Sequence, residues 1–387
     1  MAKQYISTGI VGASHKSDVL DVEIAKNFTI TISSDGFLKI WDNNSKELAG
    51  EKFVDKLGLH HLTIFEDVLN EIPVFLIATV SFSGIVYILK VDSNSNIINS
   101  INVLDKTDLP IELTDFKKSF WAPKFLKDPL NVNHRLSITK ATGKTAVFEL
   151  ILNSSEDLSE ISPVFKFIDD TTVTETKFGT CIDIDTTTSL MAVGHQNGAV
   201  YLFDIHNLRP IYTFNSFGSK KESVSSLSTC RCVRFSPGGT ILAVARDSGS
   251  HGTITLYDVK YGETIGQLHV ATHSADIKMG GFAHDGWCLS LSFNEEGEYL
   301  ASGGFDNKVR IWNVATKERE ATITISKTDV SDEILANDNS PLDKTACCAL
   351  KFINKGVMKD EGGLTNDGIV MVAIDRAIRW FREAGGI

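Results

Sequence analysis

YLASGGFDNKVRIWN, from Tyr299 to Asn313, is the stretch of the chain that decides the fold. Small and apolar residues run as far as Gly304, and an Asp-Asn pair follows. Polar and apolar residues then alternate up to Trp312. Alternation with a period of two is typical of a half-buried β-strand, and Asp and Asn favour tight turns. The stretch therefore predicts two antiparallel strands joined by a short turn.

The same phrase recurs along the chain, most clearly as ITISSDGFLKIWD from Ile30 to Asp42. The seven copies, some of them degenerate, end at Asp42, Lys90, Glu149, Asp204, Asp258, Asn313 and Phe381. Their ends are about 48 to 68 residues apart, somewhat more than the ~40–45 residues typical of WD repeats. The excess falls in polar inserts, which cost little stability as loops at a rim. These inserts are Asp92–Asp115, Asn153–Thr176, Ser216–Ser228 and Thr328–Lys344.

A further strand precedes several of the copies. CVRFSPGGT (Cys232–Thr240) and CLSLSFNEEGE (Cys288–Glu298) both alternate before a polar turn. Each repeat thus contains an inner, a middle and an outer strand, and the lead-in to the next repeat supplies a fourth. We predict an all-β fold, a seven-bladed WD-repeat β-propeller in which residues 1–387 form a single domain.

The two ends of the chain indicate how the ring closes. The last copy stops at Phe381, and the residues after it are too few for an outer strand. Gln4–Val11 is a strand-like segment that precedes the first copy. Pairing of this segment with the last blade would close the ring and remove its exposed edges.

Two copies carry polar residues at the positions where WD repeats place a buried, hydrogen-bonded tetrad. They are His15, Thr31, Asp35 and Trp41 in the first copy, and His284, Ser302, Asp306 and Trp312 in the best copy. A buried polar group left without a partner costs about 1–3 kcal/mol, so such a network stabilises the fold only when it is complete. We interpret these histidines and aspartates as structural rather than catalytic.

Composition excludes several classes of function. The net charge is −11, and an acidic chain is a poor partner for a phosphate backbone, so no direct nucleic-acid binding is expected. The first residues lack the pattern of a signal peptide, and no apolar run approaches the roughly 18 residues of a membrane span. An intracellular protein without a membrane partner is expected. The 6 cysteines include no C-x-x-C pair and are interpreted as small buried residues.

Isolated motifs give no catalytic, cofactor or metal site. GKT at Gly143–Thr145 lacks the glycine of a phosphate-binding loop, since Ile138 stands five residues before Gly143. His60–His61 has no third ligand at metal spacing and is assigned to a blade loop. Asp183 and Asp185 alternate on one strand face, which is more often solvated surface than an acid-base pair.

Several longer segments are more specific than the repeat itself. They are SSDGFLKIWDN (Ser33–Asn43), SFWAPKF (Ser119–Phe125), VRFSPGGTILAVARDS (Val233–Ser248), FAHDGWCLSLSFNEEGE (Phe282–Glu298) and DRAIRWFREAGG (Asp375–Gly386). With these segments the chain closely resembles the WD-repeat subunit of the fungal superkiller (Ski) complex over nearly its whole length. The long inserts match poorly.

The resemblance implies a non-catalytic scaffold without cofactors. Two copies of the family's subunit bind a tetratricopeptide-type helical-repeat scaffold that also carries an RNA helicase. The assembly feeds mRNA to the cytoplasmic exosome for 3′-to-5′ decay and restrains certain viral RNAs. In the nucleus the same subunit helps to recruit the topoisomerase-like protein that makes meiotic double-strand breaks. Cytoplasmic and nuclear locations are both implied.

Residues that begin the innermost strand of each blade are expected to line the narrow top face, where partners commonly dock. Asp18 and Trp287 fall there, with Trp121 close by, and Arg379 and Arg382 near the tail are further candidates. Exposed tryptophans are frequent binding hot spots, although a tryptophan packed between blades is the competing interpretation, above all for Trp121.

Two other classes of function remain open. A substrate receptor of a ubiquitin ligase or chromatin complex would use the same disc for other clients, but no helical extension is visible in the sequence. A propeller enzyme would gather charged residues in its central channel. The polar sets recognised in the sequence lie within blades rather than across them.

Overall fold

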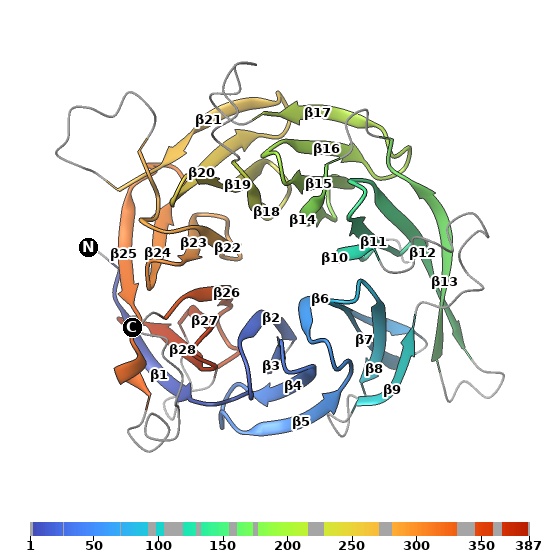
Figure 1. Cartoon of the computed structure of the whole chain (residues 1–387), viewed down its shortest axis with the longest axis horizontal. Helices are drawn as coiled ribbons and strands as arrows, with labels where there is room; N and C mark the ends of the chain where they lie inside the picture. Colours follow the sequence, from blue (N-terminus) through green and yellow to red (C-terminus); the bar gives the residue numbers. More distant parts are fainter. Residues whose placement is uncertain are drawn as a thin grey trace.

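The computed structural model describes residues 3–25, 27–69, 71–91, 98–103, 119–128, 133–154, 161–172, 177–215, 228–270, 281–330, 345–358 and 366–385. These residues form seven four-stranded antiparallel sheets, arranged as blades around a central channel (Figure 1). The predicted seven-bladed β-propeller is confirmed. Besides the strands there is a one-turn 3₁₀ helix at Lys327–Asp329, and the described residues include no helix that could cross a membrane.

In six blades the four strands follow one another along the chain, from the channel outward. The first contains β2 (Val19–Ala25), β3 (Phe28–Ser33), β4 (Phe37–Asp42) and β5 (Leu48–Phe53). The second contains β6 (Leu59–Leu69), β7 (Ile72–Ser81), β8 (Val86–Val91) and β9 (Ile98–Val103). The third contains β10 (Phe120–Leu126), β11 (Arg135–Lys140), β12 (Thr145–Ser154) and β13 (Ile161–Asp170).

The next three blades repeat this order. The fourth contains β14 (Gly179–Asp185), β15 (Leu190–His195), β16 (Val200–Asp204) and β17 (Pro210–Phe214). The fifth contains β18 (Cys230–Phe235), β19 (Ile241–Ser248), β20 (His251–Asp258) and β21 (Glu263–Leu268). The sixth contains β22 (Cys288–Phe293), β23 (Tyr299–Gly304), β24 (Lys308–Asn313) and β25 (Arg319–Thr324).

The seventh blade joins the two ends of the chain. It contains β26 (Cys347–Ile353), β27 (Gly368–Ala373), β28 (Ile378–Glu383) and, as its outer strand, β1 (Tyr5–Val11). The pairing of β1 with β28 runs from Tyr5 opposite Glu383 to Val11 opposite Ile378. Lys3 adds an ion pair to Glu383 at 2.7 Å. Closure of the ring by the N-terminal strand is confirmed.

Two of the predicted inserts contain regular structure. The outer strands β9 and β13 lie inside the segments 92–115 and 153–176, which the sequence predicted as rim loops. The segments around these two strands are rich in polar residues, so their composition alone does not distinguish an outer strand from a loop. Most of the other two inserts, residues 216–227 and 331–344, lies outside the described residues.

The residues of the turn between the second and third strands of a blade explain its backbone conformation. In the first blade Gly36 adopts φ +84°, and the equivalent turn of the sixth blade places Asn307 at φ +59°. Glycine and asparagine are the residues that tolerate this left-handed region. The Asp35 carboxylate accepts a hydrogen bond from the Phe37 N–H at 2.9 Å, which fixes the same turn.

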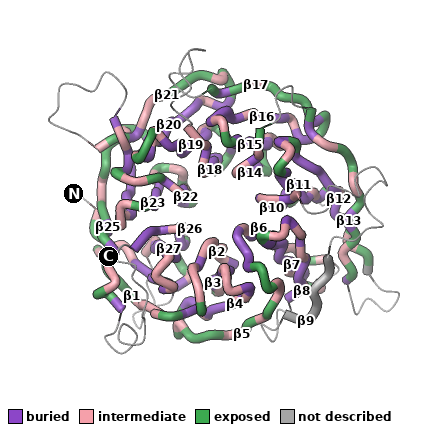
Figure 2. The backbone as a smooth tube through the Cα atoms, in the orientation of Figure 1, coloured by how far each residue is buried: buried purple, intermediate pink, exposed green. Residues whose placement is uncertain are grey.

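The apolar core lies between neighbouring blades, in the inner and middle strands. Figure 2 shows buried backbone toward the channel and exposed residues along the outermost strands. Between the fifth and sixth blades, Ala245, Ile254, Leu291 and Trp312 are all fully buried in one cluster. Full burial of one large aliphatic side chain stabilises the fold by about 1.5–3 kcal/mol. The ring is therefore rigid, and its two faces carry the surfaces available to partners.

Candidate protein-binding face

The first tetrad ties three parts of one blade together. The Thr31 hydroxyl on β3 lies 2.9 Å from His15 Nε2 and accepts a hydrogen bond from Trp41 Nε1 at 2.9 Å. His15 Nδ1 lies 3.3 Å from the Asp35 carboxylate in the turn after β3. The tetrad thus links the loop before β2 to three other parts of the blade: strand β3, strand β4 and the turn between them.

The sixth blade repeats this network with shorter distances. Ser302 Oγ lies 2.8 Å from both His284 Nε2 and Trp312 Nε1, and His284 Nδ1 lies 2.8 Å from Asp306 Oδ1. Arg310 adds an ion pair to Asp306 at 2.6 Å. All four predicted side chains are brought together, as in the first blade.

Burial and hydrogen bonding set the charges of these groups. Burial lowers the pKa of both His15 and His284, so each ring is neutral at physiological pH. Burial would raise the pKa of Asp35, but hydrogen bonds from His15 and from backbone N–H groups outweigh it and lower the pKa to about 2. A neutral imidazole held by a carboxylate and a hydroxyl inside a blade acts as a cross-link, which agrees with the structural interpretation.

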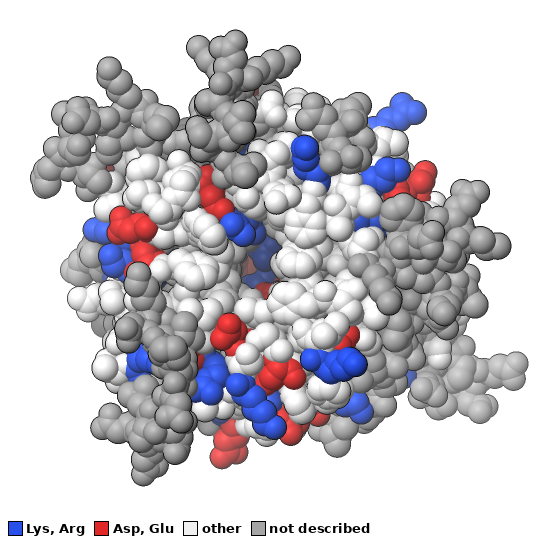
Figure 3. Space-filling model, viewed as in Figure 1, with Lys and Arg blue, Asp and Glu red and all other residues white. Residues whose placement is uncertain are grey.

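The central channel holds charged residues from different blades, contrary to the expectation that polar sets stay within blades. Lys124 on β10 pairs with Asp183 on β14 at 2.9 Å, and Lys351 on β26 pairs with Glu23 on β2 at 2.8 Å. Arg234 on β18 lies 4.0 Å from Asp183. Figure 3 shows basic side chains in the hollow at the centre of the disc.

The interpretation of Asp183 and Asp185 as solvated surface is wrong, because both side chains are buried. Burial would raise the pKa of Asp183, but Lys124 and then Arg234 outweigh it and lower the pKa. Asp183 Oδ2 also accepts a hydrogen bond from the Phe235 N–H of the next blade at 2.9 Å. The channel carboxylate therefore holds neighbouring inner strands together.

A bulge near the start of every inner strand turns one side chain toward the channel mouth. The register shifts at β2, β6, β10, β14, β18, β22 and β26. Bulges commonly redirect a side chain toward a functional surface. At this position β10 carries Trp121, β18 carries Arg231 and β6 carries His60.

Trp121 belongs to an aromatic cluster that spans three blades. Its ring stacks on His60 with centroids 4.0 Å apart and meets Phe178 edge to face at 5.0 Å. Phe82 lies 6.4 Å away and is 49% exposed. Trp121 itself is half-buried, so it both packs between blades and presents an edge to solvent.

Trp287 forms a second aromatic cluster, on the fifth and sixth blades. The Arg231 guanidinium lies 4.5 Å from the centre of its ring, and Phe305 meets it edge to face at 5.9 Å. Trp287 Nε1 donates to the Gly249 carbonyl at 3.0 Å. Trp287 is 39% exposed and Phe305 is 41% exposed, although each ring is held in place.

We call the six residues Phe82, Trp121, Phe178, Arg231, Trp287 and Phe305 the aromatic face. All lie where inner strands begin or middle strands end, on one side of the ring. Rigid aromatic rings beside a cation, partly exposed on a flat face, are the usual anchors of a protein interface. Arrangement and chemistry therefore favour recognition of a protein partner.

The other predicted binding residues differ in position. Asp18 is half-buried just before β2, and burial raises its pKa. Arg379 is fully buried and pairs with Asp375 at 2.6 Å. The expectation that Arg379 contacts a partner is therefore corrected, because its guanidinium supports a blade turn. Arg382 is half-buried at the opposite end of β28, away from the aromatic face.

The histidine pair and the cysteines show no metal geometry within the described part of the chain. His60 and His61 begin strand β6 rather than a loop, and their Nδ1 atoms face each other at 2.6 Å. Burial lowers the pKa of both rings, that of His61 to about 4. Five cysteines are buried and all six are free thiols. The described residues contain no group of three ligands placed to hold a metal.

Sequence reasoning missed Phe82, Phe178, Arg231 and Phe305. Phe82 and Phe305 directly follow the second strand of their blades. Phe178 directly precedes β14, and Arg231 lies at the bulge of β18. Alignment of all seven copies on those strand ends, rather than a search for tryptophan alone, would have found them. Arg231 and Trp287 belong to different blades, so their contact cannot be predicted from the sequence of a single repeat.

Comparison with known proteins supports the family that the sequence resembles. A model of the WD domain, G-beta repeat, matches residues 278–313. The chain is 36% identical over 413 residues to "Antiviral protein SKI8" of Saccharomyces cerevisiae, covering 100% of both proteins. It is 24% identical over 269 residues to "Meiotic recombination protein rec14" of Schizosaccharomyces pombe, covering 68% of this chain and 74% of that protein. A shorter similarity, 27% over 141 residues, links it to the ribosomal subunit protein RACK1 of Candida albicans.

Proposed function

The chain belongs to the SKI8 family of WD-repeat proteins, and on that premise we propose that it is a non-catalytic scaffold subunit of a superkiller complex. In this role it binds a tetratricopeptide-type helical-repeat scaffold and supports the helicase that delivers mRNA to the cytoplasmic exosome. The full-length similarity to the antiviral SKI8 protein supports this assignment.

The aromatic face is the observation that carries the proposal. Trp121 and Trp287 lie on the same side of the disc and belong to different blades, with Arg231 stacked on the second ring. Packing already restrains these rings, so they lose little conformational freedom when a partner binds. The partner contact is therefore assigned to this face.

Two features support a role without catalysis. The carboxylates Glu23 and Asp183 in the channel pair with lysines of other blades, and the His284–Asp306 pair is enclosed within a tetrad. The charges and protons of these groups are already engaged in ion pairs and hydrogen bonds that stabilise the fold. We propose that neither set takes part in a reaction.

A second duty in meiosis is supported by the similarity to the meiotic recombination protein rec14. We propose that the same subunit recruits the topoisomerase-like protein that makes meiotic double-strand breaks. This assignment gives the protein a cytoplasmic location together with a nuclear share during meiosis.

Alanine substitution on the aromatic face tests the proposal. We expect Trp287→Ala, and Trp121→Ala with it, to weaken capture of the helical-repeat scaffold by about 30-fold, because a hot-spot aromatic contributes about 2 kcal/mol or more. The measurement is a pull-down from cell lysate, quantified by mass spectrometry.

Tyr261→Ala is the matched control, since Tyr261 is an exposed aromatic residue on the opposite side of the ring, 64% accessible. Trp287→Ala retains the folded core, and its thermal unfolding is compared with that of the unmodified chain. Undiminished capture by a folded Trp121→Ala, Trp287→Ala double variant would contradict the assignment. Recovery of ubiquitin-ligase or chromatin subunits instead would favour a substrate receptor.

A further inference from the structure

Two thiols from neighbouring blades meet in the inner layer of the ring. Cys181 on β14 and Cys230 on β18 place their sulfur atoms 3.6 Å apart, and both side chains are buried. A bond between two sulfur atoms is about 2 Å long, so an approach of about 1.5 Å would join this pair. The thiols of the other four cysteines lie 3.6 to 3.9 Å from backbone carbonyl oxygens; these are Cys232, Cys288, Cys347 and Cys348.

The residues around the pair leave room for the two sulfur atoms and for their approach. A Cβ added at Gly194 would lie 2.5 Å from Cys230 Sγ and 2.6 Å from Cys181 Sγ, so only a glycine there lets the thiols meet. Thr180, the residue before Cys181, donates to the Cys230 carbonyl at 2.6 Å and holds the two strands together. Both cysteines lie at bulges, where the strand ladder is interrupted and a small backbone shift breaks few hydrogen bonds.

The two thiols differ in their access to small molecules. Cys181 lines a hollow of about 80 Å³ in the channel, together with Arg231 and Arg234. A hollow of this size holds one or two molecules the size of water. Cys230 is fully buried. Cys181 is therefore the thiol that a small reagent in the channel reaches first.

The charges near Cys181 set how fast it reacts. Burial, with a smaller contribution from Cys230, raises the pKa of Cys181, and Thr180 and Arg234 offset this only in part. The thiolate is the reactive form of cysteine, so at neutral pH only a small fraction of Cys181 reacts at any moment. Sustained rather than brief exposure to an oxidant is needed to convert it.

We propose that Cys181 and Cys230 are a peroxide-sensitive pair, which hydrogen peroxide converts to a disulfide between the fourth and fifth blades. The Cys181 sulfur attacks one peroxide oxygen, and the O–O bond breaks. Cys181 becomes a sulfenic acid, and the other oxygen leaves as water with the proton of the thiol. The Cys230 sulfur then attacks the Cys181 sulfur, the S–O bond breaks, and a second water leaves. In sum, two thiols are oxidised by two electrons and one peroxide is reduced to two waters.

The position of the pair suits a reversible modification. Thiols of cytosolic proteins are kept reduced, and disulfides that form there are usually transient. A small thiol such as glutathione reverses the bond by exchange. The bond would join the innermost strands of two blades next to Phe178 and Arg231 of the aromatic face. The chemistry belongs to the chain alone and does not depend on the proposed superkiller role.

The test exposes the folded full chain to hydrogen peroxide, removes the peroxide with catalase, and alkylates the denatured protein with N-ethylmaleimide. We expect the loss of two of the 6 reactive thiols and their recovery after treatment with dithiothreitol. Mass spectrometry of a tryptic digest locates the bond. Trypsin cleaves after Arg231 and separates Cys230 from Cys232, so a peptide that contains Cys181 should be joined to the one that ends at Arg231.

Substitutions at the two positions test the order of attack. In Cys230→Ser the sulfenic acid on Cys181 has no thiol to condense with, and dimedone, which traps sulfenic acids, should label Cys181. In Cys181→Ser, Cys230 should remain unlabelled and reduced. Cys230→Ala replaces Cys230→Ser if the buried hydroxyl lowers stability, and circular dichroism checks the fold of each variant. Cys288→Ser is the matched control, because Cys288 is fully buried at the start of the next inner strand, and it should still form the bond.

Several results would overturn the proposal. Retention of all six thiols after prolonged exposure of the folded chain would show that the pair does not react. A bond that involves other cysteines, or that forms only in urea, would show that the contact in the folded ring is not its cause. Conversion of Cys181 to sulfinic acid in the unmodified chain, without a bond to Cys230, would contradict the role of Cys230 as the second thiol.

Discussion

At the scale of single residues, Ser302 illustrates how the polar interior stabilises the ring. His284 Nδ1 lies 2.8 Å from Asp306 Oδ1 and 2.7 Å from Arg310 Nη1, and His284 Nε2 lies 2.8 Å from the Ser302 hydroxyl oxygen. The same oxygen accepts from Trp312 Nε1. One hydroxyl therefore satisfies two buried rings on different parts of the blade.

We expect Ser302→Ala to lower the free energy of unfolding by about 2–3 kcal/mol, because two buried ring nitrogens lose their partner at once. Urea unfolding followed by tryptophan fluorescence measures the change. Ser7→Ala on the exposed outer strand β1 is the matched control, with an expected effect within about 0.5 kcal/mol. Equal stability of Ser302→Ala and the unmodified chain would show that the network is not stabilising.

Asp21 gives the channel a dependence on pH. Burial, with a smaller contribution from Glu23, raises the pKa of Asp21 to about 6, and Lys351 offsets this only in part. Because the native pKa lies above the ordinary value of 3.8, the native state gains stability as the pH falls through 6 toward 3.8. Above pH 6 the buried charge opposes folding.

Asp21→Asn removes this titration. We expect the stability of the variant relative to the unmodified chain to be about 1 kcal/mol more favourable at pH 7.5 than at pH 5, since one unit of pKa shift corresponds to about 1.4 kcal/mol. Urea unfolding at both pH values measures it, with Asp285→Asn at an exposed site as control. A difference of the opposite sign would mean that Asp21 is stabilised as the anion.

Some of these residue roles could be predicted and others could not. The tetrads follow from spacing within one repeat, as with Ser302 and Trp312. The environment of Asp183 does not, because an alternating strand looks the same whether its polar side faces water or a channel lined by other blades. Arg379 was misplaced for a similar reason: its partner Asp375 is in the turn before β28, and its guanidinium also donates to the Ser326 carbonyl, which follows β25 of the neighbouring blade.

At the scale of elements, β1 is the strand on which the seventh blade depends. Without it, β28 would expose the unpaired backbone groups that now pair from Tyr5 to Val11. Lys3 would also lose its ion pair to Glu383 and its position 3.9 Å from the centre of the Tyr299 ring on the sixth blade. The strand thus connects the seventh blade to its neighbour as well as completing it.

We expect deletion of residues 1–11 to lower the melting temperature by several degrees or more and to promote aggregation through the open edge. Differential scanning fluorimetry and light scattering measure the two effects. A chain with Ser7→Ala and Thr8→Ala, which keeps the backbone pairing, should melt close to the unmodified chain. An unchanged transition after deletion would contradict the role assigned to β1.

The number of blades and the closure of the ring were predictable because one sequence pattern recurs in each blade and its last copy lacks an outer strand. The outer strands β9 and β13 were not, because they fall within long polar segments that differ from copy to copy. The same holds for the inner-strand bulges, which present Trp121 and Arg231. A bulge is a feature of pairing between strands and leaves no distinct trace in the order of residues.

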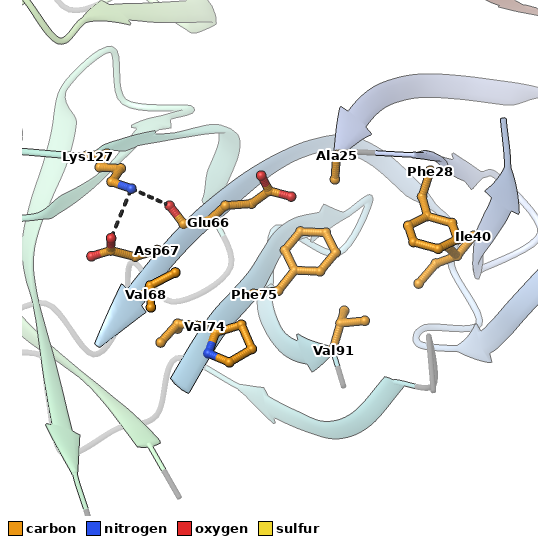
Figure 4. A pocket seen from close by; sticks show the side chains of 11 residues that line it. Ala25, Phe28, Ile40, Glu66, Asp67, Val68, Val74, Phe75, Val91 and Lys127 are labelled. Atoms are coloured by element: carbon orange, nitrogen blue, oxygen red, sulfur yellow. Dashed lines mark hydrogen bonds and ion pairs between the residues drawn. The ribbon is translucent and has the colours of Figure 1, made fainter. Parts of the chain in front are cut away.

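At the scale of the whole molecule, the ring separates two differently built faces. The aromatic face lies where inner strands start, and an apolar pocket lined by Phe28, Val74 and Phe75 lies where they end (Figure 4). The ion pairs across the channel, such as Lys351 with Glu23, keep the blades between these surfaces in fixed relation. A partner that binds the aromatic face would therefore meet a preformed site, which limits the entropy lost on binding.

The shared seventh blade has a consequence for synthesis. β1 is synthesised before the six complete blades, yet its hydrogen-bonding partner β28 is synthesised after them. The nascent β1 must therefore wait, without its native neighbour, until β28 has been made. Co-translational folding can complete six blades in order, but the circle itself closes only after β28 has left the ribosome.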